Sequence, residues 1–160
     1  MGRYPHSGSS SAEKDAEISA KVMDLTGTSH LSHRSYLSLS GGEQQRVQLS
    51  RVLAQIWDVP NAVLLMDEPV SSLDILYQQQ TLAIARKLVE CGVMVLAILH
   101  DINLASQYAD RIIMLKDGKK YYDGPPSEVL LASNIAEVFN VEADVYTNPL
   151  TQRTFLSQRM

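Results

Sequence analysis

The sequence predicts an α/β fold: a mainly parallel sheet with flanking helices, plus a helical subdomain. Two apolar runs, Ala62–Met66 and Val93–Leu99, support this prediction because each has the length of one strand and neither alternates with polar residues. Unbroken apolar strands are typical of parallel sheets covered on both faces. A helical pattern over Ser72–Glu90 separates the runs, so strand, helix and strand follow one another as a βαβ unit.

The region before the first run is expected to be mostly helical. Residues 12–25 place apolar side chains at helical spacing after the loop Ser7–Ser11, which is rich in serine. A second helix is expected from about Gly42 to Trp57, since its apolar residues also recur with helical period and Pro60 follows it.

After the second run, the sequence predicts short elements. Asp101 can cap a brief helix, and Lys116-Asp117-Gly118 marks a hairpin turn. Pro125 opens a C-terminal part that we expect to be helical, including a helix at Asn134–Phe139. The expected organisation is a helical subdomain at 1–57, a core portion at 58–122 and a C-terminal helical segment at 123–160.

Composition excludes some classes of function. The net charge of −4 argues against a nucleic-acid binder that relies on a basic face. Cys91 is the single cysteine, so it has no internal disulfide partner, which fits a reducing compartment. No run approaches the ~20 apolar residues needed to cross a bilayer. We therefore expect a soluble chain whose membrane role, if any, comes through a partner.

The run Leu39–Arg46 includes a potential anion site. Ser40 and Glu43 have the spacing of a capping box, which alone would account for both. Gly41 and Gly42 each cost about 1 kcal/mol in backbone entropy relative to alanine. Their presence is easier to explain if a ligand approaches the backbone closely, because a helix start offers N–H groups and a positive dipole end to an anion.

Asp67 and Glu68 follow the first apolar run directly, where ligands bind in open α/β sheets. The alternative is a solvated acidic turn before Pro69. Asp74 suits the start of the next helix, and His100 follows the second run, where a lone histidine is usually structural.

These segments resemble the motifs of ABC-type ATPases, which belong to the P-loop NTPases. Leu39–Arg46 resembles the signature motif, Val63–Pro69 the Walker B strand with its catalytic glutamate, Ser71–Asp74 the D-loop, and His100 the switch histidine. The resemblance implies ATP and Mg²⁺ as cofactors. It also implies a homodimer in which the signature of one subunit completes the ATP site of the other.

The same resemblance assigns roles. Ser40, Gly41, Gly42, Gln44 and Asp74 would contact ATP across the dimer. Asp67 would hold Mg²⁺ through water. Glu68 would polarise the attacking water, and His100 would contact the γ-phosphate; these two are the implied catalytic residues.

Further segments resemble importers of iron chelates, cobalamin and haem: Gly2–His6, Leu99–Ala105 and Asp123–Leu130. Gly41–Ile56 and Val138–Ala143 resemble the haem-importer branch most closely. This implies a peripheral subunit on the cytoplasmic side of the inner membrane, which couples ATP hydrolysis to haem import. Its implied partners are transmembrane permease subunits and, indirectly, a periplasmic substrate-binding protein. A ferric-siderophore or cobalamin importer is the alternative.

No G-x-x-x-x-G-K-[ST] run occurs in the 160 residues. The sequence is therefore interpreted as the C-terminal part of a longer ancestor, unable to hydrolyse ATP alone and with unpaired strand edges, bare apolar surface and low stability. An inactive fragment remains a second interpretation. A DNA-repair or chromosome-organising ATPase is disfavoured, because those carry long heptad coiled coils before the signature and this sequence has none.

Overall fold

The computed structural model describes residues 2–158, so residues 1, 159 and 160, at the ends of the expected segments, lie outside it. The chain divides into a first unit that ends at Ile98 and a second that begins at Leu99. The three-part division at 1–57, 58–122 and 123–160 stays a prediction. Within 2–158, no helix combines the length and apolarity needed to cross a membrane.

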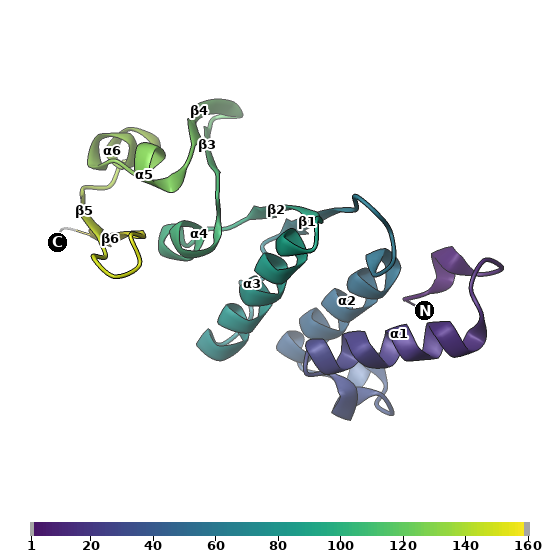
Figure 1. The fold of residues 1–160 in the computed structure, drawn as a ribbon. Helices are drawn as coiled ribbons and strands as arrows, with labels where there is room; N and C mark the ends of the chain where they lie inside the picture. Colours follow the sequence, from purple (N-terminus) through teal and green to yellow (C-terminus); the bar gives the residue numbers. More distant parts are fainter. Residues whose placement is uncertain (1, 159–160) are drawn as a thin grey trace. The chain divides into compact units, whose positions relative to one another are not determined.

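The first unit contains the βαβ arrangement that the sequence predicts. Its helices and strands are α1 (Ala12–Leu25), α2 (Gly41–Ile56), β1 (Val63–Asp67), α3 (Ile75–Glu90) and β2 (Met94–Ile98) (Figure 1). Short 3₁₀ helices lie at Tyr4–His6, Ser29–Leu31 and Tyr36–Ser38. The predicted helices over 12–25 and from about 42 to 57 are confirmed. α3 begins three residues later than predicted, because Asp74 is its N-cap.

β1 and β2 form a parallel pair in which Val63 lies opposite Met94 and Asp67 opposite Ile98. Side chains of α1, α2, β1 and α3 share one core, which contains Ile18, Val22, Leu53, Ala54, Leu64, Met66, Ile84 and Ala85. The pair lacks the coverage on both faces that is typical of parallel strands, and the bare apolar surface that the sequence predicts is present on it. Every second residue of β1 is exposed, since helices pack on only one side of the pair.

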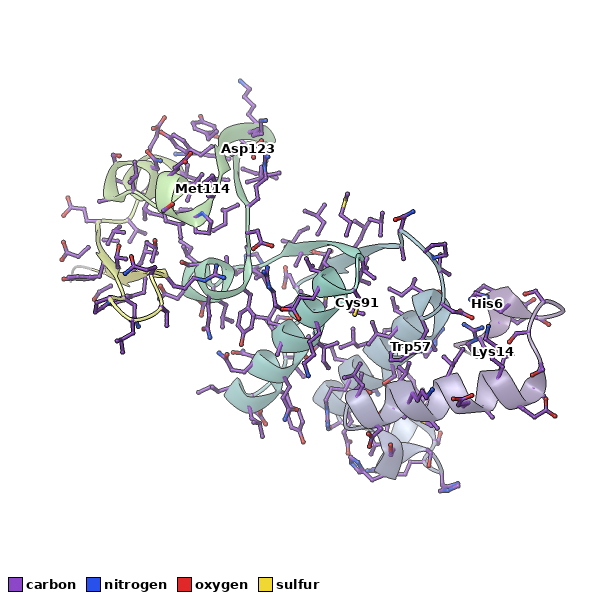
Figure 2. All side chains as sticks on the ribbon, in the orientation of Figure 1. His6, Lys14, Trp57, Cys91, Met114 and Asp123 are labelled. Carbon is purple, nitrogen blue, oxygen red and sulfur yellow. The ribbon has the colours of Figure 1, made fainter. Side chains whose placement is uncertain are left out.

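An ion-pair network holds the start of the chain against the end of α2. Arg3 is only 6% exposed; its Nε lies 2.9 Å from Asp15 Oδ1 and its Nη1 lies 2.8 Å from Asp58 Oδ1. Lys14 Nζ lies 2.8 Å from Asp58 Oδ2, and His6 Nε2 lies 2.7 Å from the Gln55 carbonyl oxygen (Figure 2). The N-terminal turn, α1 and α2 are therefore joined by charge as well as by apolar packing.

In the part of the second unit that the structure describes, residues 99–158, there are two antiparallel hairpins and three helices. Its elements are α4 (Ile102–Tyr108), β3 (Ile112–Lys116), β4 (Lys119–Gly124), α5 (Pro126–Val129), α6 (Ala132–Phe139), β5 (Ala143–Thr147) and β6 (Thr154–Gln158). The predicted hairpin at Lys116-Asp117-Gly118 is confirmed as β3–β4. Met114 lies in a separate small core with residues of α5, α6 and β5.

The segment 123–160 was expected to be helical, and it contains α5 and α6 but also the hairpin β5–β6. The loop between these strands is closed by Asn148, whose Oδ1 accepts the N–H groups of Leu150 and Thr151. An asparagine that bonds its own downstream backbone is a common turn device. The sequence signal was the pair Asn148-Pro149, which marks a turn but does not show that strands flank it.

Candidate functional site

The start of α2 has the expected capping geometry. Ser40 is the N-cap, its Oγ accepts the Glu43 N–H at 3.4 Å, and its own N–H donates to Glu43 Oε2 at 2.7 Å. The Ser40 N–H, followed by its side chain, lowers the pKa of the Glu43 carboxyl group. Arg34 Nη1 also lies 3.1 Å from Glu43 Oε1. The carboxylate is thus charged at neutral pH and holds the first turn in place.

The two glycines leave this helix start open. A Cβ at Gly41 would meet nothing of the described chain within 4 Å. Gly41 and Gly42 occupy the first two helical positions, where backbone N–H groups have no acceptor within the helix. An anion can therefore reach these groups without displacing a side chain, which is the arrangement the sequence predicts.

Gln44 and Gln45 point their amides at backbone carbonyls. Gln44 Nε2 donates to Leu39 O at 3.1 Å and to Tyr36 O at 3.3 Å, so it braces the turn before α2. Gln45 Nε2 donates to Glu68 O at 3.2 Å. The hydrogen bond from Gln45 links α2 directly to the acidic turn that begins at Glu68. The sequence alone did not predict this bond.

Asp67 ends β1 and is exposed, and Glu68 begins the turn that follows. Glu68 has φ +45°, a left-handed conformation that is uncommon for a residue with a side chain. Its carbonyl oxygen accepts hydrogen bonds from Ser71 N and Ser71 Oγ as well as from Gln45. Several donors therefore hold an unfavourable backbone at the proposed catalytic position, as often occurs at functional sites.

Asp74 is the N-cap of α3, and its Oδ1 accepts the Tyr77 N–H at 3.0 Å. The sequence suggested Ser71 or Ser72 as the cap and Asp74 in the first turn; the helix begins later, and Asp74 is itself the cap. The preceding residues pack on the start of α2: a Cβ at Gly42 would lie 3.5 Å from Leu73 Cδ2 and 3.6 Å from Ser72 O. The signature turn, the acidic turn and the D-loop segment thus lie together in the first unit.

His100 belongs to the second unit, where it is exposed between β2 and α4. Asp101 next to it caps α4, with Oδ1 accepting the N–H groups of Asn103 and Leu104. The role of His100, like the roles of Ser40, Gly41, Gly42, Gln44, Asp67, Glu68 and Asp74, stays a prediction.

Arg46 is a second residue for which the sequence suggested no role. It is 8% exposed, its guanidinium carbon lies 3.8 Å from the centre of the Tyr77 ring, and its Nη1 lies 3.4 Å from Gly27 O. A cation over an aromatic ring is stabilised by the ring quadrupole. Arg46 thereby connects α2 to α3 through its contact with Tyr77. Only the tertiary structure shows this contact.

The carboxylates suit a metal that is shared with a ligand. No group of three or more His, Cys, Asp or Glu residues within 2–158 could enclose a metal ion. Mg²⁺ in nucleotide sites is commonly held by one or two carboxylates together with phosphates. The adjacent, exposed Asp67 and Glu68 fit that kind of site and not a closed structural one.

The chain is similar to known ATP-binding proteins. No family model matches the chain. Hemin import ATP-binding protein HmuV of Gloeobacter violaceus is 48% identical over 152 residues, a match that covers 93% of this chain and 55% of the relative. The chain thus spans little more than half the length of that relative.

Two solved structures are also similar. An ABC transporter in an inward-facing conformation has a TM-score of 0.80 at 22% sequence identity, and the match covers 100% of this chain and 64% of the transporter chain. At that identity the similarity concerns the fold alone. A dimeric ATP-binding cassette in a post-hydrolysis state, bound to ADP and phosphate, has a TM-score of 0.65 at 31% identity. That match covers 74% of this chain and 50% of the cassette.

Proposed function

This chain belongs to the family of ABC-type ATP-binding proteins, and we propose that it contributes its signature motif, Leu39–Arg46, to a composite ATP site in a hemin importer. It matches part of the length of the hemin import members of that family. In this proposal, ATP is held by the P-loop of a second subunit, and the start of α2 covers it. The whole assembly couples ATP hydrolysis to hemin import.

The observation that carries the proposal is the open helix start at Gly41 and Gly42. Nothing of the described chain occupies the space beside Gly41, and the capping box holds the turn rigidly. Backbone N–H groups at a helix start bind phosphate well, because their dipoles are aligned. The related cassette that is dimeric and bound to ADP and phosphate supports a site of this kind.

The acidic turn would serve the other ATP site of such a dimer, the one completed by the partner's signature. ATP with Mg²⁺, when bound there, would supply the transferable phosphoryl group. Asp67 would hold the cation through water, Glu68 would orient the attacking water and accept its proton, and His100 would contact the terminal phosphate. A positioned base of this kind typically contributes 10²–10⁴ in rate.

The proposed assembly is a dimer of ATP-binding subunits bound to permease subunits on the cytoplasmic side of the inner membrane. The name of the relative in Gloeobacter violaceus supports the import function. A substrate-binding protein outside the membrane would act only through the permease.

Nucleotide-dependent association tests the proposal. The chain is mixed with the full-length Gloeobacter violaceus relative and a non-hydrolysable ATP analogue, and association is measured by analytical ultracentrifugation. We expect association only with the analogue, and Gly42→Asp should weaken it at least about tenfold, because a carboxylate then faces the phosphates. Ser127→Asp adds the same charge at an exposed position of α5 and should leave association unchanged. The proposal is contradicted if the two proteins associate equally well without the analogue, or if Gly42→Asp leaves the association unchanged.

Transport separates the substrates. The chain is added to membrane vesicles that contain a complete hemin importer or a complete cobalamin importer, and uptake is followed in both. We expect the chain to compete with the resident subunit in the hemin importer alone. An effect confined to the cobalamin importer would assign the other substrate.

A further inference from the structure

A hydrogen bond connects the two parts of this chain to which we assign roles in ATP binding. In the proposed dimer, the start of α2 covers the nucleotide of the second subunit, whereas Glu68 serves the other nucleotide. Gln45 is the fifth residue of α2, and its Nε2 donates to the Glu68 carbonyl oxygen at 3.2 Å. A path between the two sites therefore runs inside one chain, from a helix to the backbone of the acidic turn.

Two helices hold this turn. α3 contributes Gln78, whose Nε2 donates to Val70 O at 3.2 Å and to Leu73 O at 3.1 Å. α2 contributes Gln45, which holds the first residue of the turn. Because α3 fixes the part of the turn that follows Glu68, a change at the start of α2 acts on Glu68 itself.

The backbone of Glu68 is suited to respond to such a change. Its φ of +45° lies in the left-handed region, which persists in a residue with a side chain only where the surroundings hold it. Two of its donors are local, since both come from Ser71, whereas Gln45 comes from another element. The strength of the Gln45 bond therefore influences how firmly this backbone is held, and the direction of the Glu68 carboxylate depends on the backbone.

The second polar atom of the Gln45 amide is also informative. Gln45 Oε1 is buried and has no hydrogen-bond partner among the described residues. An unsatisfied buried acceptor is destabilising, so stability alone does not favour an amide here. Its presence is explained if the bond from Nε2 to Glu68 has a function besides stability.

We propose that Gln45 is a positioning residue that couples the two ATP sites within this chain, an inference that rests on the proposed function. Phosphate bound at Gly41 and Gly42 orders the first turns of α2, and Gln45 then holds the Glu68 carbonyl more firmly. The Glu68 carboxylate is thereby fixed for the other nucleotide. Coupling of this kind is reciprocal, so a firmly held Glu68 also strengthens phosphate binding at the start of α2.

Hydrogen exchange in the nucleotide-dependent complex tests the proposal. The chain is mixed with the full-length Gloeobacter violaceus relative, with and without the non-hydrolysable ATP analogue. Exchange is measured at residues 68–71, which include the Ser71 N–H that donates to Glu68 O. The measured quantity is the factor by which the analogue slows this exchange. Gln45→Met keeps an unbranched side chain but removes the amide, and it should lower the factor about two- to tenfold, which is the worth of one hydrogen bond.

A brace without a coupling role predicts a different result. In that case Gln45→Met speeds exchange equally with and without the analogue, so the slowing factor stays the same. Reciprocity adds a second measurement: association in the presence of the analogue, followed by analytical ultracentrifugation, should weaken in Gln45→Met by the same factor. Gln48→Met, which loses an exposed contact with Arg51 on the same helix, is the control and should change neither quantity. Circular dichroism confirms that each variant is folded.

The outcomes distinguish this proposal from the one on which it rests. If the unmodified chain fails to associate in the presence of the analogue, the composite ATP site is contradicted and the coupling with it. If the chain associates but Gln45→Met leaves the slowing factor unchanged, or Gln48→Met lowers it equally, the coupling through Gln45 alone is overturned.

Discussion

At the scale of single residues, Glu68 combines an unfavourable backbone with unusually good anchoring. A left-handed conformation costs on the order of 1 kcal/mol for a residue other than glycine. The Glu68 carbonyl accepts hydrogen bonds from Gln45 and Ser71, and these bonds offset that cost. The turn is therefore held in a fixed shape by side chains that take no part in the proposed chemistry.

Gln45→Ala tests this anchoring. The substitution removes the donor to Glu68 O and should lower the free energy of unfolding by about 1 kcal/mol or less. Gln45 Oε1 is buried without a hydrogen-bond partner among the described residues, and its removal partly compensates. The sharper measurement is hydrogen exchange at residues 68–71, which should become faster. Gln48→Ala, which loses only an exposed contact with Arg51 on the same helix, should leave that exchange unchanged.

The sequence predicts contacts between residues of one helical turn but not contacts between segments that meet only in the folded chain. The capping box at Ser40 and Glu43 was predictable, because both partners lie within one turn. The Gln45 contact was not, since it joins a side chain to a backbone carbonyl 23 residues away and no pattern of residue types specifies a carbonyl. The same holds for Arg46 and Tyr77, which meet only after α2 and α3 pack.

At the scale of elements, α2 depends on its N-terminal cap. Ser40→Ala removes the acceptor of the Glu43 N–H, and the long 3.4 Å bond places the loss at the lower end of the capping range, about 0.5–1 kcal/mol. Urea unfolding followed by circular dichroism measures it. The Ser40 backbone N–H still donates to Glu43 in this variant, so the lowered pKa of Glu43 should persist. A loss as large as that of a core truncation would contradict this interpretation.

The join between the N-terminal turn, α1 and α2 depends on Arg3. Its Nη1 also donates to Ala54 O at 2.9 Å, so Arg3→Met removes a donor from this carbonyl and from two carboxylates, of which Asp58 keeps Lys14. We expect a loss of about 1–3 kcal/mol, because hydrogen bonds to charged groups exceed neutral ones. Trp57, which neighbours Asp58, reports the unfolding by fluorescence. Arg51→Met, on an exposed face of α2, should change stability little; an equal loss there would refute the special role of Arg3.

Element prediction succeeded where the apolar pattern spans a full element. The helices over 12–25 and 42–57 repeat their apolar residues with helical period, and the two strands of the βαβ unit are unbroken apolar runs. The hairpin β5–β6 was missed, because its strands mix polar and apolar residues and its only clear signal is the turn at Asn148-Pro149. The apolar runs of β1 and β2 correctly predicted parallel strands. The bare apolar surface was predicted from the absence of a P-loop run and not from the strands themselves, since the residues that cover a face belong to other segments.

At the scale of the whole molecule, the family assignment came from motif order, whereas the distribution of charge came from the structure. The residues that pair around Asp58 lie 55 and 44 positions away along the chain, at Arg3 and Lys14, so sequence spacing does not indicate them. The second unit has a comparable group, in which Arg111 and Lys120 lie 2.6 Å and 2.8 Å from the two oxygens of Asp123 (Figure 2). Each unit thus contains a carboxylate paired with two cations.

These two carboxylates make the whole chain sensitive to acid. Hydrogen bonds from Arg3 and then Lys14 hold the pKa of Asp58 far below its usual value of 3.8, and Arg111 and then Lys120 do the same for the pKa of Asp123. A carboxyl group whose pKa is lower in the folded state contributes stability above its unfolded pKa, and this contribution is lost as the pH falls through the folded value. We therefore expect the free energy of unfolding to fall below about pH 4, with no loss from these groups between about pH 5 and pH 8.

Salt should separate the two contributions. Arg111 and Lys120 are 70% and 60% exposed, whereas Arg3 is 6% exposed. At about 1 M salt the Debye length is near 3 Å, so the Asp123 group should be screened and the Asp58 group much less so. Urea unfolding between pH 5 and pH 2 then gives a direct comparison: Asp58→Asn should flatten the acid dependence at low and high salt, and Asp123→Asn at low salt only. If Asp58→Asn has no effect at high salt, the Arg3 network is no better shielded than a surface pair, and the N-terminal turn is not held by it.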